Sequence, residues 1–406
     1  MNLGLIDATG FRIGLSEVSK IYLGSYEAWS NFGPIRNIAF VGDSITDQGS
    51  TSLFSMAARG YYGWAQVFNR QKWEIQPNIT GSRLAFATSG ATTATIQSSF
   101  LATVLASSVD TVVWHTGQND RTTGALTPLQ SANAIRAVWA AIKAAGKRPI
   151  ATTLTGLKGL LAGGQSWVLE VNEYIRTYAA SDGVTLCDWA TINNVGGANN
   201  AVLDPAYTYD DIHPNATGAS RMGRVLAATL APFLVDTNDP FSGLINVSPN
   251  PSWTGGPPPT SWTHTIGSGN SVGTQTYEAS SDPSKWWRIP HTQGTSNSSQ
   301  IITFSDTISV YNGVRFASLI EIEVLSGALT TVRGVQYMQG GGTEARALNQ
   351  VDAYSSVGQI FPSDGKVILR TPFTTGTGST TNVYCDFNYA GNVNFRIRRL
   401  ATWQAT

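Results

Sequence analysis

The sequence contains few charged residues, and this excludes some classes of binding partner. Only 13% of the 406 residues are charged, and 26 basic residues are balanced by 26 acidic ones. Binding to nucleic acid depends on a basic surface that neutralises phosphates, so no nucleic-acid partner is expected. The balance is compatible with a neutral ligand such as a carbohydrate.

Cysteine and long apolar runs are also scarce. The two cysteines, Cys187 and Cys385, lie in separate strand-like runs, so no disulfide framework is expected. No apolar run approaches the roughly 20 residues that span a bilayer, so no membrane partner is expected. The first residues show no basic segment followed by an apolar one, as a secretory signal would. Neither the cysteines nor the histidines show ligand spacing, so the sequence predicts no metal and no cofactor.

What the sequence does contain divides into three parts. Residues 1–34 mix short strand-like pieces with glycines and predict a small β appendage or attachment segment. Residues 35–236 alternate strand and helix patterns. Residues 241–406 follow a proline- and glycine-rich stretch and contain strand patterns only, which predict a β-sandwich or jelly roll.

The middle part, residues 35–236, has the pattern of a parallel α/β sheet. Five short apolar runs predict strands at 35–42, 83–87, 109–114, 149–154 and 184–189. Helical patterns lie between or after them at 127–146, 167–178 and 219–230. Strands that alternate with helices predict a parallel sheet with helices on both faces.

The first of these helices has the clearest end signals. Thr127 can cap it, Pro128 suits the first turn, and Gly146 suits the position just after the last turn. One apolar face is predicted to pack on the sheet, and it consists of Leu129, Ala132, Ile135, Trp139 and Ile142.

Polar residues follow several of the predicted strands. Ser44 follows the first strand, Gly90 the second and Asn119 the third, and Asp210 and His213 follow the last one. Ligands collect at the carboxyl ends of the strands in open α/β sheets. A serine needs a base, a group that orients the base and donors for an oxyanion before it can attack a carbonyl. These residues could supply all three.

Each of these features alone has a structural interpretation. A Gly-Asp-Ser turn usually just ends a strand, and Asp43 and Asp120 are interpreted as hydrogen-bonding groups that hold two turns. Asp204 and Asp211 compete with Asp210 as the orienting carboxylate. His115 is interpreted as packing at the end of the sheet.

Four short blocks together resemble the SGNH hydrolases, also called GDSL-type esterases. The blocks are "GDSIT" (42–46), "SGATT" (89–93), "GQND" (117–120) and "DDIHP" (210–214), and the resemblance covers roughly residues 35–235. It implies a flavodoxin-like parallel sheet and ester hydrolysis without a metal. It further implies that Ser44 is the nucleophile, that His213 is the base and that Asp210 orients it. The implied oxyanion hole consists of the Ser44 and Gly90 backbone N–H groups and the Asn119 side chain.

The C-terminal part is the best sequence clue to the ester. It resembles a galactose-binding-like or carbohydrate-binding jelly roll, and it contains Trp253, Trp262, Trp286, Trp287 and Trp403. Trp286 and Trp287 are adjacent, so they face opposite sides of a strand. We therefore predict them as sugar-binding residues, and we predict O-deacetylation of an acetylated polysaccharide.

Other interpretations remain open. The segment "VSKIYLGSYEAW" (18–29) is similar to N-terminal modules of bacteriophage tail proteins, which suggests a virion-associated enzyme with virion or homo-oligomer contacts. A secreted bacterial enzyme would also be extracellular. The β part could instead be an attachment domain of a general short-chain carboxylesterase or lipase. The chain could also be a non-catalytic virion or adhesion protein on a hydrolase scaffold.

Overall fold

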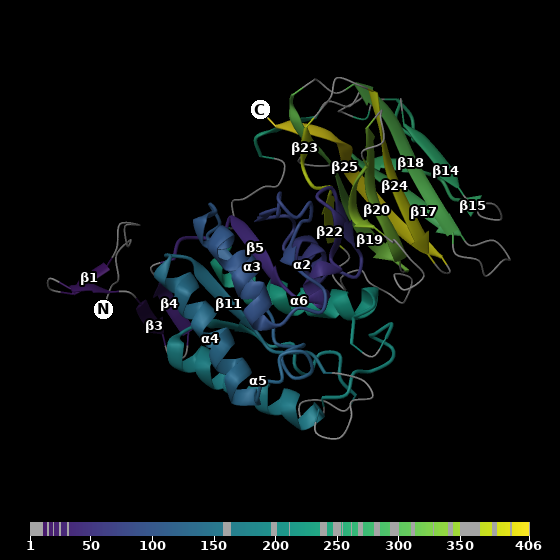
Figure 1. Cartoon of the computed structure of the whole chain (residues 1–406). Coiled ribbons are helices and arrows are strands. Elements are labelled where there is room, and N and C mark those ends of the chain that lie inside the picture. The colour runs from purple at the N-terminus through teal and green to yellow at the C-terminus, as the bar shows by residue number, and fades with distance from the viewer. Residues whose placement is uncertain are drawn as a thin grey trace.

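Two regions with different architectures lie side by side in the computed structural model (Figure 1). Residues 32–235 form the α/β domain and residues 242–405 form the β domain. The structure describes residues 11–13, 16–18, 20–23, 26–30, 32–156, 164–195, 201–210, 212–235, 242–246, 253, 255–260, 262–266, 271–279, 285–292, 300–309, 313–327, 329–339, 344–349, 366–375, 380–389 and 392–405.

The α/β domain is built on a parallel sheet with the strand order β12-β11-β10-β5-β8, in which β9 also pairs with β5. This confirms the predicted parallel sheet, and every predicted strand takes part in it. The two-residue strand β8 was not predicted, because it does not lie in an apolar run as β9 does. The strands are β5 (Asn37–Gly42), β8 (Glu74–Ile75), β9 (Phe86–Ala87), β10 (Thr111–His115), β11 (Arg148–Thr152) and β12 (Thr185–Cys187).

Helices cover both faces of this sheet, as predicted. Alternate strand residues face opposite sides, so Phe40 packs in a core with α2 and α6, while Val41 packs in a core with α3 and α4. A further core joins α4 and α5 beside β11. The helices are α2 (Tyr61–Phe68), α3 (Thr93–Ala106), α4 (Pro128–Ala144), α5 (Gly164–Asp182) and α6 (Ala216–Leu230).

Helix α4 confirms the predicted end signals and corrects one predicted core residue. Thr127 and Gln130 form a reciprocal capping box, and Gly146 has a φ of +72° after the last turn. Leu129, however, is 43% exposed. At 100° per residue it lies about 120° around the helix from Ile135, outside the arc that faces the sheet.

The β domain consists of two antiparallel sheets, which confirms the predicted all-β fold. One has the order β15-β17-β25-β19-β22 with β13, β16 and β23 at its margins, and the other contains β14-β18-β24-β20-β21. The strands are β13 (Leu244–Asn246), β14 (Thr263–Ile266), β15 (Ser271–Val272), β16 (Thr276–Glu278), β17 (Trp286–Thr292), β18 (Gln300–Ser309), β19 (Arg315–Ser326), β20 (Leu329–Gln339), β21 (Glu344–Asn349), β22 (Lys366–Arg370), β23 (Thr374–Thr375), β24 (Thr380–Tyr389) and β25 (Val393–Ala405).

The core of the β domain lies between its two sheets. Trp287 and Phe395 come from the first sheet, and Ala345 and Cys385 come from the second. Side chains from both inner faces therefore interdigitate, as in a sandwich. Cys385 and Cys187 are both buried and free.

The two domains share this core and a sheet. Strands β6 (Ser50–Ser52) and β7 (Ser55–Ala57) leave the α/β domain, and β7 pairs in parallel with β21 of the β domain. Trp64 of α2 belongs to the same buried cluster as Trp287. A further link is the bidentate ion pair between Arg370 and Glu74, with N–O distances of 2.5 and 2.6 Å. The interface between the two domains is thus packed like a protein core, with an ion pair in addition.

The residues before the α/β domain form two small antiparallel pairs, which confirms the predicted β appendage. They are β1 (Phe11–Ile13) with β2 (Ser16–Val18), and β3 (Lys20–Leu23) with β4 (Tyr26–Ser30). Ile35 then bridges Leu234 in parallel, so the two ends of the α/β domain lie together. A search of the described residues finds no helix long and apolar enough to cross a membrane.

Candidate active site

Ser44 lies at the carboxyl end of the central strand β5, on the first residue of the short helix α1 (Ser44–Asp47). Asp43 caps this helix, with its Oδ1 accepting from the Ile45 N–H at 3.1 Å. A Cβ on Gly42 would overlap the Thr46 side chain and the carbonyl oxygen of His115. Only glycine therefore allows the strand to turn this closely, and the turn directs Ser44 to the sheet edge.

A chain of hydrogen bonds joins Ser44 to His213 and Asp210. His213 Nε2 lies 2.8 Å from Ser44 Oγ, although the residues are 169 positions apart. His213 Nδ1 lies 2.7 Å from Asp210 Oδ2. The other carboxylate oxygen accepts from the backbone N–H groups of Ile212 at 2.8 Å and His213 at 2.6 Å. The structure thus brings these three residues together.

The surroundings of Asp210 favour its charged form. Burial raises the pKa of Asp210, but the hydrogen bonds from the His213 side chain and from the His213 and Ile212 backbones outweigh it, so the pKa lies below the ordinary 3.8. The carboxylate is therefore ionised at neutral pH. In this state it can hold Nδ1 protonated and leave Nε2 to accept the serine proton.

Gly90 and Asn119 lie beside each other at the same edge. Gly90 is exposed with a φ of +74°, a conformation that favours glycine. Asn119 Nδ2 donates to the carbonyl oxygen of Ala91, the residue after Gly90, at 3.1 Å. A side-chain amide has two N–H groups, so this bond uses one and fixes the direction of the other.

Asp43 and Asp120 hold the turns around the site, as interpreted from the sequence. Burial raises the pKa of Asp43 to about 7, against the lowering effect of the bond from Ile45. Asp120 is fully buried and accepts from the Thr93 N–H and hydroxyl, both at 2.7 Å, and from the Ser131 hydroxyl at 2.6 Å. It thereby ties the "GQND" loop to the starts of α3 and α4.

The competing candidates occupy other places. Asp204 Oδ1 accepts from the Ala206 N–H at 2.8 Å and stabilises a turn. Asp211 lies outside the described residues. His115 is fully buried, with Nδ1 2.9 Å from Thr152 Oγ1, and burial lowers its pKa to about 3. It is a neutral packing residue at the end of β10.

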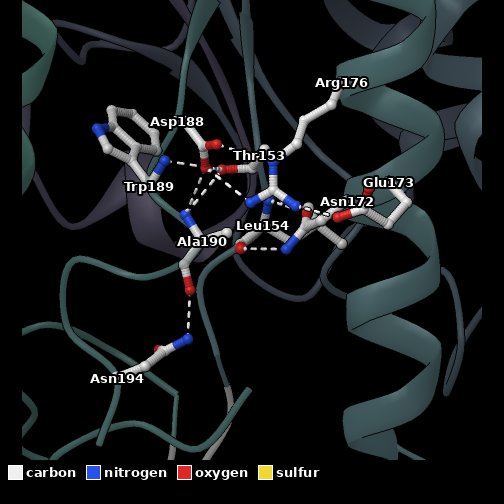
Figure 2. Close-up of polar contacts among 9 residues, drawn as sticks. All are labelled: Thr153, Leu154, Asn172, Glu173, Arg176, Asp188, Trp189, Ala190 and Asn194. Carbon is white, nitrogen blue, oxygen red and sulfur yellow. Dashed lines mark hydrogen bonds and ion pairs between the residues drawn. The ribbon is translucent and has the colours of Figure 1, made fainter. Parts of the chain in front are cut away.

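A polar network fixes the neighbouring strand ends (Figure 2). Thr153, just after β11, donates to Asp188 Oδ1 at 2.9 Å and accepts from the backbone N–H groups of Trp189 and Ala190. Arg176 of α5 donates to Asp188 Oδ2 at 2.8 Å. This network joins β11, β12 and α5.

Sequence reasoning missed Tyr209, which lies against the histidine. Its ring stacks on the imidazole of His213, with centroids 5.7 Å apart and planes 16° apart. Its hydroxyl donates to Gln48 Oε1 at 2.8 Å. Its position immediately before Asp210 in "YTYDDIHP" was the available signal.

The predicted sugar-binding residues Trp286 and Trp287 are both buried, so neither offers an open ring face to a sugar. Trp287 is fully buried between the sheets, and its Nε1 donates to Gln275 Oε1 at 2.8 Å. Trp286 points to the opposite face but is only 7% exposed. The guanidinium carbons of Arg396 and Arg398 lie 4.6 and 4.4 Å from its ring centroid and cover it. Strand alternation assigned the faces correctly but could not show this cover.

Of the five tryptophans noted in the β part, Trp253 and Trp262 are also buried. Within the described residues, no group of three or more His, Cys, Asp or Glu side chains could hold a metal ion.

A family profile matches most of the α/β domain. Residues 40–221 match the profile of the GDSL-like Lipase/Acylhydrolase family. No curated protein matches the sequence at a significant level.

Several solved structures resemble about half of the chain. A GDSL-like lipase from Bacteroides thetaiotaomicron VPI-5482 is 21% identical, with a TM-score of 0.37, over 49% of this chain and 89% of that one. An alpha/beta hydrolase enzyme from the metagenome of Lake Arreo, Spain, is 18% identical, with a TM-score of 0.40, over 50% and 99%. A variant of an acetyl-xylooligosaccharide esterase from Geobacillus Stearmophilus is 16% identical, with a TM-score of 0.39, over 49% and 96%. Similarity at this level says nothing about substrate.

Proposed function

We propose that the protein is a serine esterase that removes acetyl groups from an acetylated polysaccharide, and we take as the premise its match over residues 40–221 to the GDSL-like Lipase/Acylhydrolase family profile. The observation that carries the proposal is the pair of hydrogen bonds from Ser44 Oγ to His213 Nε2, 2.8 Å, and from His213 Nδ1 to Asp210 Oδ2, 2.7 Å. A serine hydroxyl bonded to an oriented imidazole is an activated nucleophile.

In the first half of the reaction, Ser44 Oγ attacks the ester carbonyl carbon while His213 Nε2 takes the hydroxyl proton. The carbonyl oxygen becomes an oxyanion. Asp210 stabilises the imidazolium through Nδ1. His213 then gives the proton to the departing sugar oxygen as the C–O bond breaks, which leaves an acetyl group on Ser44.

The oxyanion needs hydrogen-bond donors that are already in place. We assign this role to the backbone N–H groups of Ser44 and Gly90 and to Asn119 Nδ2. The bond from Asn119 to Ala91 supports the assignment, because it holds the amide next to the Gly90 loop. Donors of this kind act on charge that develops only in the transition state.

In the second half, water attacks the acetyl-enzyme. His213 Nε2 takes a proton from the water, and a second tetrahedral oxyanion forms in the same place. The proton then passes to Ser44 Oγ as its bond to the acetyl carbon breaks. Acetate leaves, and the enzyme returns to its starting state without a cofactor.

An open, polar rim supports a bulky polar substrate. Thr88, Ser89 and Gly90 are exposed beside the nucleophile, and Asp210 is 41% exposed. Ser44 itself is only 8% exposed, so an ester group has to reach down to it from the surface. A small acetyl group on a polysaccharide fits this geometry, and an extracellular or virion-associated location would expose the enzyme to such a glycan.

The test is an acetate-release screen across acetylated polysaccharides, with Ser44→Ala as the control. The proposal predicts release from at least one polysaccharide by the wild type and none by Ser44→Ala. Release by Ser44→Ala, or hydrolysis of small esters with no release from any glycan, contradicts it.

One observation favours a second candidate, a general short-chain carboxylesterase. Ile212, between Asp210 and His213, is 37% exposed and offers an apolar surface beside the triad. Rates on 4-nitrophenyl esters separate the two. A rise from acetyl to octanoyl favours the carboxylesterase or a lipase, and a fall favours the acetylesterase.

A further inference from the structure

The stacked ring of Tyr209 belongs to the same loop as the catalytic histidine. The Tyr209 N–H donates to the carbonyl oxygen of His213 at 3.2 Å, and the two rings are nearly parallel. Asp210 bonds one ring nitrogen of His213, but a single hydrogen bond leaves the plane of the imidazole free to tilt. A flat neighbour restricts that tilt.

Tyr209 is itself held by a segment that lies far away in the sequence. Its hydroxyl donates to Gln48, 161 residues earlier. The guanidinium carbon of Arg59 lies 5.0 Å from the centroid of its ring, within the range of a cation–π contact. Both residues belong to the stretch that follows the nucleophile, between α1 and α2.

Gln48 and Arg59 lie at the base of the hairpin formed by β6 and β7. A glycine follows each of them: Gly49 follows Gln48, and Gly60 follows Arg59. A Cβ on Gly60 would overlap the Cα of Gly49, and the Ala57 N–H donates to the carbonyl oxygen of Gly49 at 2.9 Å. Close packing of the two glycines thus fixes Gln48 and Arg59 relative to each other.

The other end of the hairpin is anchored in the β domain. Ser55 and Ala57 of β7 are in register with Arg346 and Asn349 of β21. Met56 is 2% exposed and shares a buried cluster with Ala347 of β21. The hairpin therefore connects the sheet of the β domain to Gln48 and Arg59, the two residues that hold Tyr209.

We propose that Tyr209 is a positioning residue that holds the imidazole of His213 toward Ser44, and that the hairpin 48–60, anchored in the β domain, holds Tyr209. The inference rests on the proposed function, because it takes His213 as the base. Tyr209 acts through the histidine and takes no part in proton transfer. The β domain thereby supports the reaction through the hairpin that holds Tyr209.

The experiment compares full-length variants on 4-nitrophenyl acetate. Tyr209→Leu removes the aromatic face, and Tyr209→Phe keeps the face but removes the hydroxyl. Tyr207→Leu is the matched control, because Tyr207 lies two residues earlier and its ring packs against Arg221, 4.1 Å from the centroid. Melting temperatures are measured for all variants.

Loss of an aromatic stack is expected to lower kcat about tenfold in Tyr209→Leu, with KM changed less than about twofold. Tyr209→Phe should recover most of this loss, and Tyr207→Leu should keep the kcat of the wild type. Equal kcat values for Tyr209→Leu and Tyr207→Leu would overturn the positioning role, as would a rise in KM in place of a fall in kcat. An active Ser44→Ala would instead overturn the proposed function.

A double-mutant cycle tests the link to the hairpin. Gln48→Leu removes the acceptor of the tyrosine hydroxyl and should lower kcat about two- to threefold. In the Tyr209→Phe background the same substitution should have no further effect, because the hydroxyl is already gone. Fully additive effects would show that Gln48 does not act through Tyr209.

Discussion

His213 of the α/β domain and two histidines of the β domain have opposite surroundings. In the α/β domain, Ser44, Asp210 and His213 meet at an open sheet edge, where they bond to one another. In the β domain, His264 and His291 pack against each other with ring centroids 5.7 Å apart, and His264 packs edge-on to Trp287. Burial lowers their pKa values to about 4 and about 3, so both are neutral.

Topology explains this difference. Parallel strands all end at one edge, so residues far apart in sequence can converge there. In an antiparallel sandwich, each strand reverses direction and every second side chain enters the core. His213 thus takes part in a site at the strand ends, whereas His264 and His291, like the buried His115 of the α/β domain, pack in an interior.

The largest predicted effect concerns the triad. Asp210→Asn should lower kcat about 10⁴-fold, because the amide can no longer hold the imidazole in the required tautomer. Ester hydrolysis measured beside a melting curve checks this, and Asp204→Asn is the matched control that should retain activity. Comparable losses of kcat in the two variants would show that Asp210 does not orient His213 and that both carboxylates only stabilise turns.

The next effect concerns the oxyanion hole. Asn119→Ala should lower kcat by about 10²- to 10³-fold, because one donor to the oxyanion is lost. Asn119→Asp keeps the shape of the side chain but replaces the donor by a carboxylate that repels the oxyanion, so it should lose at least as much. Steady-state kinetics of both variants test the assignment. A wild-type kcat in either one would exclude Asn119 from the oxyanion hole.

In the β domain, substitutions should change stability rather than chemistry. Trp287→Ala should lower the free energy of unfolding by about 3–5 kcal/mol, because it empties a fully buried site. Trp286→Ala should cost about 0.5–2 kcal/mol, mainly from the lost contacts with two guanidinium groups. Urea denaturation measures both. A loss of glycan binding in folded Trp286→Ala would restore the sugar-binding role for this residue.

Two buried ionisable groups should give opposite pH dependences of stability. The pKa of Asp43 is raised from 3.8 to about 7, so the folded protein binds a proton that the unfolded chain releases, and stability falls as pH rises between these values. The pKa of His291 is lowered from 6.5 to about 3, so the unfolded chain binds a proton that the folded protein does not. Stability therefore falls as pH falls from 6.5 towards 3.

Melting temperatures of two variants test these signs. The melting temperature of Asp43→Asn, compared with that of the wild type, should rise more at about pH 8 than at about pH 5. The asparagine can still cap α1, and it does so without a buried charge. His291→Gln should show the reverse trend, with its relative gain on the acid side. Parallel trends in the two variants would contradict the assigned protonation states.

The sequence predicted the features that depend on local pattern. The apolar runs located the strands of the parallel sheet, and Thr127 and Gly146 marked the ends of α4. The order of motifs at the strand ends grouped Ser44 with Gly90, Asn119, Asp210 and His213. These predictions were possible because residues that are close in the sequence determine the periodicity and the ends of each element.

The missed features depend on distant partners. Strand β7 has three residues and no pattern of its own, and its partner β21 lies nearly 300 residues later. The burial of Trp286 depends on Arg396 and Arg398 of another strand. The role of Tyr209 depends on Gln48 and Arg59. These partners lie far apart in the chain, so no local periodicity predicts their contacts.

The central claim is that Ser44 is a nucleophile activated by His213. Labelling with a fluorophosphonate, followed by mass mapping of the adduct, tests it without knowledge of the natural ester. We predict one adduct, on Ser44, in the wild type, and greatly slowed labelling in folded His213→Ala. An unlabelled wild type, or an adduct on another residue, would contradict the account and favour a non-catalytic scaffold.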